Sequence, residues 1–304
     1  MQLPEAVKRR IEERAETVGF AALERAAAAM SQAYREGRGA RLADEERTAA
    51  YLVTRMPATY AAARMVMEEL RGLGVESVLD AGAGTGAASL AARAEFPAAA
   101  VTMIERDPAL AEAARDWLPD AKVTVADLAG IETLPQADLA IAAYAVGEMR
   151  KSIWRKLWAA ARVALVVIEP GTPKGFALVR DLRHELLGAG ARMIAPCPGA
   201  MACPMAANDW CHFAARVERS SVHRRIKHGE LGYEDEKFSY LAVAREEAKP
   251  AAARVIRHPL HRPGLITIET CTPEGRRTER VGKRDRDRFR AARRAVWGGR
   301  WGTV

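Results

Sequence analysis

The fold of this chain follows from nine consecutive residues, Val78-Leu79-Asp80-Ala81-Gly82-Ala83-Gly84-Thr85-Gly86. A short apolar strand runs into a turn with three glycines, and an alanine-rich helix begins at Ala87. Glycines allow the tight turn and let a ligand approach the backbone, while the start of the helix offers free N–H groups to a polar ligand. We therefore predict a nucleotide-cofactor loop. The dinucleotide pattern G-x-G-x-x-G/A fits as well, because residue 87 is alanine.

Two further acidic residues at strand ends favour one class of cofactor. The next strand ends at Glu105, 19 residues after Gly86, and a third strand is followed by Asp127. Together with Asp80, these carboxylates suit a cofactor with an amino acid ammonium, a ribose diol and an adenine amine. The pattern resembles the class I S-adenosylmethionine-dependent methyltransferases. That resemblance implies that Asp80 and the glycines line the methionine end, Glu105 holds the ribose hydroxyls and Asp127 faces the adenine. The implied cofactor-binding residues are Asp80, Gly82, Gly84, Gly86, Glu105 and Asp127.

Composition predicts a globular cytoplasmic protein. The 304 residues are 49% hydrophobic, which is enough to bury a substantial core. No run of about 18 apolar residues could span a membrane. The N-terminal residues have no apolar signal core and many Glu residues, so we expect neither a signal nor a transit peptide. In a reducing compartment the four cysteines are thiols or metal ligands rather than disulfides. We expect a monomer.

The positive charge is concentrated in the C-terminal third. Residues 212–304 hold 22 Lys and Arg against 12 Asp and Glu, whereas residues 1–211 hold 25 against 27. A localised excess of this kind indicates a polyanion such as nucleic acid, with an ordinary solvated surface as the alternative. We expect the basic run 216–227, interpreted as a helix, and the Arg-rich segment 283–294 to form the nucleic-acid surface.

Strand and helix patterns alternate between residues 75 and 190, which predicts an α/β fold with a parallel sheet and helices on both faces. The strands are expected at 77–80, 100–105, 122–126, 138–143 and 163–168. The helices are expected at 87–95, 108–117, 149–161 and 174–188. The fifth strand leads into Glu169-Pro170-Gly171-Thr172-Pro173, a rigid turn that could shape a pocket at the carboxyl edge of the sheet.

Four parts of the chain are expected. Residues 1–74 form an N-terminal helical region, with one helix from Pro4 to about Arg35 that ends at Gly37 and Gly39 and another region from Asp44. Pro57 begins or kinks its last segment. Residues 75–194 form the Rossmann-like core, and residues 195–236 form a cysteine-rich insertion. Residues 237–304 supply the last core strands, a β-hairpin near 265–281 and a basic tail.

Three of the four cysteines fall within fifteen residues, at Cys197, Cys203 and Cys211, and the fourth is Cys271. Four thiols with this clustering indicate metal binding. They could hold zinc or an iron–sulfur cluster, and the wide spacing leans toward the larger cluster because structural zinc sites use tighter cysteine pairs. His212, His223 or His228 could supply a nitrogen ligand, although we expect each to be an ordinary side chain.

Several segments together resemble a methyltransferase-like family associated with the small ribosomal subunit of bacteria and mitochondria. The matching segments are 55–60 (Arg-Met-Pro-Ala-Thr-Tyr), 80–86, 169–173, 197–241, 271–275 (Cys-Thr-Pro-Glu-Gly) and the Trp297 tail. The resemblance implies a four-cysteine 4Fe–4S site at Cys197, Cys203, Cys211 and Cys271. It also implies rRNA and the small ribosomal subunit as partners, in assembly or rRNA methylation.

Two functions remain open. The protein either transfers a methyl group from S-adenosylmethionine to rRNA, or it is a non-catalytic assembly factor that docks on RNA. In the second case the cysteines hold zinc rather than an iron–sulfur cluster. The fourth strand continues into Ala142-Ala143-Tyr144-Ala145-Val146-Gly147-Glu148, so the Asn-Pro-Pro-Tyr type motif of amine methyltransferases is absent. No catalytic residue is predicted. Fold alone cannot decide between the two functions.

Overall fold

The computed structural model describes residues 2–35, 45–200, 202–227 and 229–302. Its central sheet has the order β3-β2-β1-β4-β5-β8-β6, and β7 pairs with β8. The strands β1 to β5 are parallel, and β8 is antiparallel to β5, β6 and β7. This order and these directions are those of a Rossmann-like class I methyltransferase fold, as the sequence predicted. The strands are β1 Ser77–Ala81, β2 Ala100–Glu105, β3 Lys122–Val125, β4 Ala137–Ala143, β5 Ala161–Pro170, β6 Arg192–Ala195, β7 Phe213–Glu218 and β8 Tyr233–Ala244.

Helices cover both faces of this sheet, because alternate residues of each buried strand face opposite sides. On β5, Val166 and Ile168 pack with the helices α4 and α5, whereas Leu165 and Val167 pack with α7 and α8. The helices of the core are α4 Met56–Met67, α5 Ala87–Glu95, α6 Pro108–Trp117, α7 Ile153–Ala160 and α8 Pro173–Gly188. The bounds of β1 to β4 and of α5, α6 and α8 agree closely with the prediction, whereas α7 is shorter than the expected 149–161.

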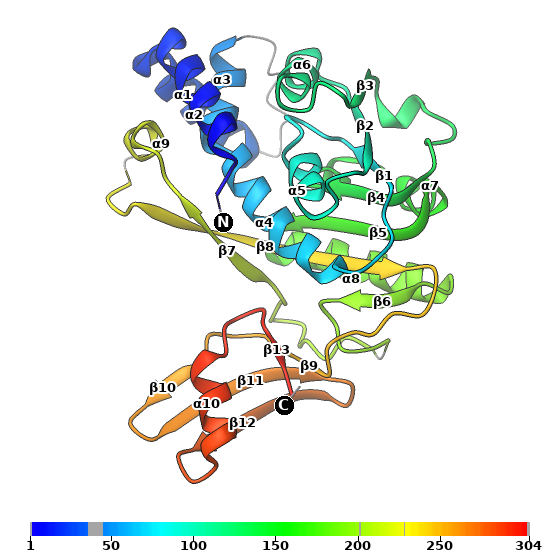
Figure 1. Ribbon diagram of the computed structural model, residues 1–304, viewed down its shortest axis with the longest axis vertical. Coiled ribbons are helices and arrows are strands. Elements are labelled where there is room, and N and C mark those ends of the chain that lie inside the picture. Colours follow the sequence, from blue (N-terminus) through cyan, green and yellow to red (C-terminus); the bar gives the residue numbers. More distant parts are fainter. Residues whose placement is uncertain (1, 36–44, 201, 228, 303–304) are drawn as a thin grey trace.

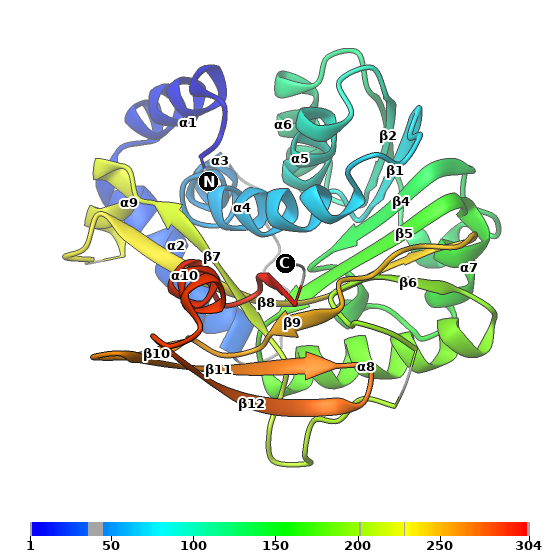
Figure 2. The ribbon, with the colours of Figure 1, turned by 60° about the horizontal axis from the view of Figure 1, so that its bottom comes forward.

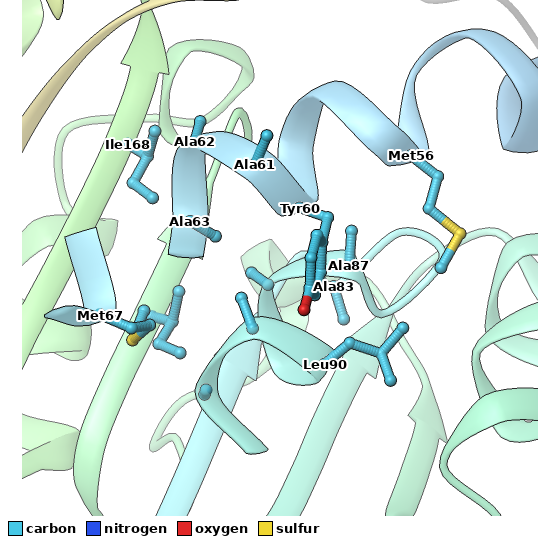
Figure 3. Close-up of a cluster of buried hydrophobic side chains, with 14 of the residues drawn as sticks. Met56, Tyr60, Ala61, Ala62, Ala63, Met67, Ala83, Ala87, Leu90 and Ile168 are labelled. Carbon is cyan, nitrogen blue, oxygen red and sulfur yellow. The ribbon is translucent and has the colours of Figure 1, made fainter. Parts of the chain in front are cut away.

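The helix α4 covers the glycine loop. It begins next to Pro57 as expected, and its alanines are buried on nearly every side. Figure 3 shows Tyr60 pointing down from α4 toward Ala83 and Ala87, with Leu90 of α5 beside them. The N-terminal helical region is thus packed directly on the loop that the sequence singled out.

The prediction of one long N-terminal helix is wrong. The helix is divided into α1 Glu5–Val18 and α2 Phe20–Arg35 by Gly19, whose φ of 82° no residue in a right-handed helix adopts. The third helix is α3 Glu45–Thr54. The expected positions of Gly37, Gly39 and Asp44 lie outside the described residues.

The segment 216–227, which we expected to form one basic helix, is helical only in its second half. It forms the end of the strand β7 and then the short helix α9 Ser221–Ile226. Phe213, Ala215 and Val217 are buried in alternation, which is the period of a strand. The strand β8 begins at Tyr233, so it crosses the expected boundary between residues 236 and 237.

A second sheet forms a C-terminal lobe (Figure 1, orange to red; Figure 2). Its order is β10-β11-β9-β13, with β12 paired to β11, and the hairpin of β11 and β12 is the expected one. The helix α10 packs on one face through Ala292 and Phe289. Its elements are β9 Ala253–Val255, β10 Leu260–Arg262, β11 Leu265–Thr272, β12 Gly275–Gly282, α10 Arg286–Arg294 and β13 Arg300–Trp301. Among the helices of the described residues, none is long and apolar enough to cross a membrane.

Candidate functional site

The glycine loop leaves β1 at Ala81 and enters α5. Gly82, Gly84 and Gly86 have φ values of 78°, 54° and 75°, all in the left-handed region that favours glycine. The N–H groups of Gly82 and Ala83 both donate to Ile104 O, at 2.9 and 3.1 Å. These bonds fix the loop to the end of β2.

The three glycines have different steric surroundings. A Cβ on Gly82 would lie 2.8 Å from Ala145 Cβ, and one on Gly86 would lie 3.2 Å from both Ala114 Cβ and Met103 Sδ. Among the described residues, only the Tyr51 hydroxyl would lie within 4 Å of a Cβ on Gly84, at 3.7 Å. Packing of the protein on itself therefore explains glycine at 82 and 86, and Gly84 marks the side of the loop that a ligand can approach.

Asp80 lies beneath the loop and is fully buried. Its Oδ2 accepts a 2.7 Å hydrogen bond from Ser89 Oγ. Its Oδ1 has no hydrogen-bond partner among the described residues. Burial raises the pKa of Asp80 to about 6, although hydrogen bonding from Ser89 opposes this. A buried carboxylate with an unused oxygen suits a cationic partner.

The end of β2 brings Glu105 to the same place. Its Oε2 accepts the Gly84 N–H at 2.7 Å and its Oε1 accepts the Asp107 N–H at 2.9 Å. Asp127, which follows β3, accepts from Ala129 N at 2.8 Å. The structure thus places Asp80, Glu105 and the glycines together, with Asp127 at the neighbouring strand end.

Sequence reasoning missed a polar group at the end of β4. Tyr144 has a φ of 55°, which is unusual for a residue other than glycine. Its hydroxyl donates to Glu236 Oε1 at 3.0 Å, and Arg55 Nη2 lies 3.7 Å from the same oxygen. Burial raises the pKa of Tyr144 well above its usual value. Both partners lie in stretches that the sequence singled out, 55–60 and 197–241, but no local pattern joins them.

Glu169, at the end of β5, holds the loop that carries Tyr144. Its Oε1 accepts the Gly147 N–H at 3.1 Å. A Cβ on Gly147 would lie 3.0 Å from Glu169 Oε2, so the loop fits closely around the carboxyl group. Burial raises the pKa of Glu169 to about 7, although hydrogen bonds from the backbone of Gly147 and Val146 lower it. The same loop presents Ala145 to Gly82, which links Glu169 to the glycine loop.

The second candidate site is a cavity that all four cysteines line. Cys197, Cys203 and Cys211 come from the segment between β6 and β7, and Cys271 comes from β11 of the C-terminal lobe. The cavity has a volume of about 40 Å³. Ligand pockets measure roughly 300–1,000 Å³, so this space suits a small inorganic group rather than an organic cofactor.

The thiols are close enough to influence one another's ionisation. Burial raises the pKa of Cys211 well above its usual value, and the other three thiols raise it further. Burial likewise raises the pKa of Cys271 to about 12, with Cys197 and Cys203 adding to the effect. Such thiols stay protonated unless a cation stabilises the thiolates. In the described part of the chain, no three Cys, His, Asp or Glu side chains are arranged to hold a single metal ion.

A comparison with known protein families matches most of the chain. Residues 45–302 match the family described as mitochondrial small ribosomal subunit Rsm22. This chain is a member of the Rsm22 family. The match extends from α3 to the end of the C-terminal lobe and includes both candidate sites.

Solved structures similar to this Rsm22-family chain include methyltransferases at low identity. The plantazolicin methyltransferase BpumL, solved in complex with SAH, is 11% identical with a TM-score of 0.44, over 79% of this chain and 100% of that chain. The precorrin-6y C5,15-methyltransferase of Geobacter metallireducens is 17% identical with a TM-score of 0.42, over 60% and 87%. A comparison with curated proteins finds no match. The fold assignment rests on the strand order of the sheet.

In this Rsm22-family chain, His212 and His223 do not line the cysteine cavity. His212 stacks on Trp210 at 5.3 Å and meets Trp297 edge-on at 4.8 Å. His223 is buried on α9, with Nε2 3.4 Å from Glu234 Oε1. His228 lies outside the described residues. No described histidine lines the cavity.

Proposed function

We propose that this protein binds S-adenosylmethionine in the glycine loop and works on the small ribosomal subunit, as a methyltransferase of its rRNA. The observation that carries the cofactor proposal is the unused, buried Asp80 Oδ1 directly under the loop. The S-adenosylmethionine ammonium would pair with this carboxylate, whose buried Oδ1 has no hydrogen-bond partner among the described residues. The Rsm22 family supports the small subunit as the partner.

The other residues of the site fit the remaining parts of that cofactor. Glu105 already accepts two backbone N–H groups, but a carboxylate has about four acceptor positions and can also take the ribose hydroxyls. Asp127 follows the next strand end, where it could meet the adenine amine. When bound, S-adenosylmethionine supplies an electrophilic methyl group, and the protein contributes binding and orientation. Glu169 and Tyr144 would hold the β4 loop against the cofactor side of the sheet.

A second candidate function is a non-catalytic assembly factor that keeps the cofactor site for stability. It is favoured by the partners at the end of β4, where the Tyr144 hydroxyl is bonded to Glu236 and Glu169 is bonded to Gly147. The Tyr144 hydroxyl is thereby used as a donor to Glu236, and Glu169 Oε1 is used as an acceptor for the backbone. Transfer of a labelled methyl group to assembling small subunits distinguishes the two functions, because the non-catalytic factor binds the subunits without modifying them.

The cofactor proposal is tested by calorimetry with S-adenosylhomocysteine, comparing the wild type with Gly84→Val. The valine would fill the approach to the loop and force a side chain into the left-handed region, so binding should be lost. Gly74→Val is the control, because a Cβ on Gly74 would meet no atom of the described residues within 4 Å and Gly74 has no positive φ. A wild type that does not bind, or that prefers NAD, would refute the proposal.

We also propose that the four cysteines hold a 4Fe–4S cluster, with zinc as the alternative. A complete set of four thiols around one cavity is the donor set that such a cluster uses. The wide spacing of Cys197, Cys203 and Cys211 in the sequence favours the larger cluster, because structural zinc sites use tighter cysteine pairs.

Protein purified without oxygen should contain near-stoichiometric iron and sulfide and absorb visible light. Cys203→Ser should lose both and lower the stability of the C-terminal lobe, because cluster binding and folding are coupled. One zinc and no iron by elemental analysis would keep the site and change its identity.

A further inference from the structure

A buried arginine, Arg254 on β9, lies beside the cysteine cavity. Its side chain is only 1% exposed. Arg254 is the register partner of Cys271 on the antiparallel strand β11. Residues directly opposite each other in a sheet project to the same face. The guanidinium and the Cys271 thiol therefore share the face of the C-terminal lobe that borders the cavity.

Three parts of the molecule meet at this guanidinium. Its Nε donates to Pro196 O at 3.0 Å, directly before Cys197, and its Nη1 donates to Gly298 O at 2.9 Å. Nη1 also lies 2.5 Å from Glu69 Oε1, at the end of the N-terminal helical region. The other oxygen of Glu69 accepts from Arg300 of β13 at 2.8 Å. Glu69 and Arg254 thus tie the C-terminal lobe to the core.

The remaining nitrogen, Nη2, is buried and has no hydrogen-bond partner within the residues that the structure describes. An unpaired buried donor costs about 1–3 kcal/mol, and more when it is charged. Cys197 directly follows Pro196, whose carbonyl accepts from Arg254 Nε, and Cys271 lies opposite Arg254 in the sheet, so the sulfur atoms of the cavity are the candidate acceptors for Nη2. Burial raises the pKa of the Cys197 thiol, and Arg183 and Arg254 act in the opposite direction.

We infer that Arg254 is a positioning residue for the sulfur centre. Its Nη2 donates a hydrogen bond to a sulfur atom there, so that loading of the centre fixes the same guanidinium that holds Glu69. Docking of the C-terminal lobe on the core then depends on whether the centre is loaded. This inference rests on the proposed four-cysteine centre.

The test compares the reconstituted full-length protein with Arg254→Met, Arg254→Lys and Arg300→Met. Removal of an outer-shell partner of a metal ligand typically costs about 10–100-fold in metal affinity. Release of iron, or of zinc if zinc is bound, to a chelator should therefore be faster in Arg254→Met by up to about the same factor. Arg254→Lys should be intermediate, because it keeps the charge and loses the forked geometry. Arg300→Met is the control, since Arg300 bonds the opposite oxygen of Glu69 and is half exposed.

Hydrogen exchange of the hairpin β11–β12 gives the second readout. In the wild type, loading should slow exchange of its amides, and in Arg254→Met this difference should disappear. If Arg254→Met fails to fold, Glu69→Gln provides the same test from the other side: metal release stays near the wild-type rate while the hairpin loses its response to loading. The inference would be overturned if Arg254→Met released metal at the wild-type rate and kept the wild-type exchange response to loading. It would also be overturned if Glu69→Gln kept that exchange response. Either outcome would leave the proposed four-cysteine centre standing. A wild type with neither iron nor zinc would overturn the proposed centre together with the inference.

Discussion

Asp80 is the residue whose ionisation should control cofactor binding. Its pKa is raised by burial to about 6, so below that pH the carboxyl is mostly neutral and cannot pair with an ammonium group. We expect the affinity for S-adenosylhomocysteine to fall by up to about tenfold per pH unit below pH 6 and to be flat from pH 7 to 7.5. Calorimetry between pH 5 and 7.5 measures this. Asp80→Asn should bind weakly with no such pH dependence, and a flat wild-type profile would exclude an ionic role for Asp80.

Glu169 should make the folded protein less stable as the pH rises. Its folded pKa of about 7 lies above its ordinary value of 4.5, so the folded state holds its proton more tightly than the unfolded state. The contribution of Glu169 to the free energy of unfolding is therefore greatest below pH 4.5 and falls between pH 4.5 and 7. The whole effect is on the order of 3 kcal/mol.

Urea unfolding of the wild type and Glu169→Gln at pH 5 and pH 8 isolates this contribution. Other titrating groups are common to both proteins and cancel in the difference. From pH 5 to pH 8, the free energy of unfolding of Glu169→Gln should rise by a few kcal/mol relative to that of the wild type. An unchanged difference would mean that the carboxyl group is solvated in the folded protein.

At the scale of secondary structure, the sequence predicts the elements that are set by local pattern. The strands β1, β2 and β5 are continuous apolar runs bounded by Gly, Asp or Pro, which is typical of parallel strands buried on both faces. The short strands β9, β10 and β13 have two or three residues each and exist only because they pair with β11 or with each other. No local pattern indicates such strands.

The same distinction applies to the candidate sites. Asp80 and Glu105 could be predicted because they lie at the ends of apolar strands, the glycines because they follow the first of these strands, and parallel strands end at one edge of the sheet. The group of Tyr144, Arg55 and Glu236 could not, because the Tyr144–Glu236 hydrogen bond joins residues 92 apart in the chain. The prediction of a helix over 216–227 holds for Ser221–Ile226 and is wrong for the residues before it, because the charges there obscure the alternation of Phe213, Ala215 and Val217.

The helix α9 should depend on one contact with α2. The Arg225 guanidinium lies 3.7 Å from the centre of the Phe20 ring. A cation–π contact of this kind is worth about 0.5–1 kcal/mol at an exposed site. Arg225→Ala should therefore speed hydrogen exchange of α9 by a few fold. Arg224→Ala on the same helix should have no effect, and equal effects of both substitutions would show that charge rather than the ring contact matters.

At the scale of the whole molecule, ion pairs neutralise one of the two basic segments that the sequence indicates as an RNA-binding surface. Residues 213–237, excluding histidine, hold six Lys and Arg against five Asp and Glu. Arg219 and Lys227 both pair with Glu234, and Arg216 pairs with Asp235. The carboxylates of β8 thus neutralise most of the basic run that we expected to bind RNA.

The C-terminal lobe has a different balance. Residues 276–294, which form β12 and α10, hold ten Lys and Arg against three Asp and Glu. Lys283, Arg284 and Arg286 are exposed, and no described carboxylate lies within 4 Å of their charged groups. Cations without a carboxylate partner can release counterions from RNA without breaking an ion pair. We therefore expect the β12–α10 surface, rather than α9, to dominate binding of rRNA.

Two triple variants with the same loss of net charge test this expectation. Binding of a single-stranded rRNA fragment should weaken with salt, with a log-log slope of about −0.7 for each phosphate contact. Replacing Lys283, Arg284 and Arg286 by Ala should make that slope shallower by up to about 2. Replacing Arg224, Arg225 and Lys227 should change it by no more than about one contact, because Lys227 is paired and Arg225 is packed on Phe20. If the second variant had the larger effect, α9 would be the docking surface. Equal effects would mean that only the net charge of the protein matters, and no RNA binding by the wild type would refute the RNA partner itself.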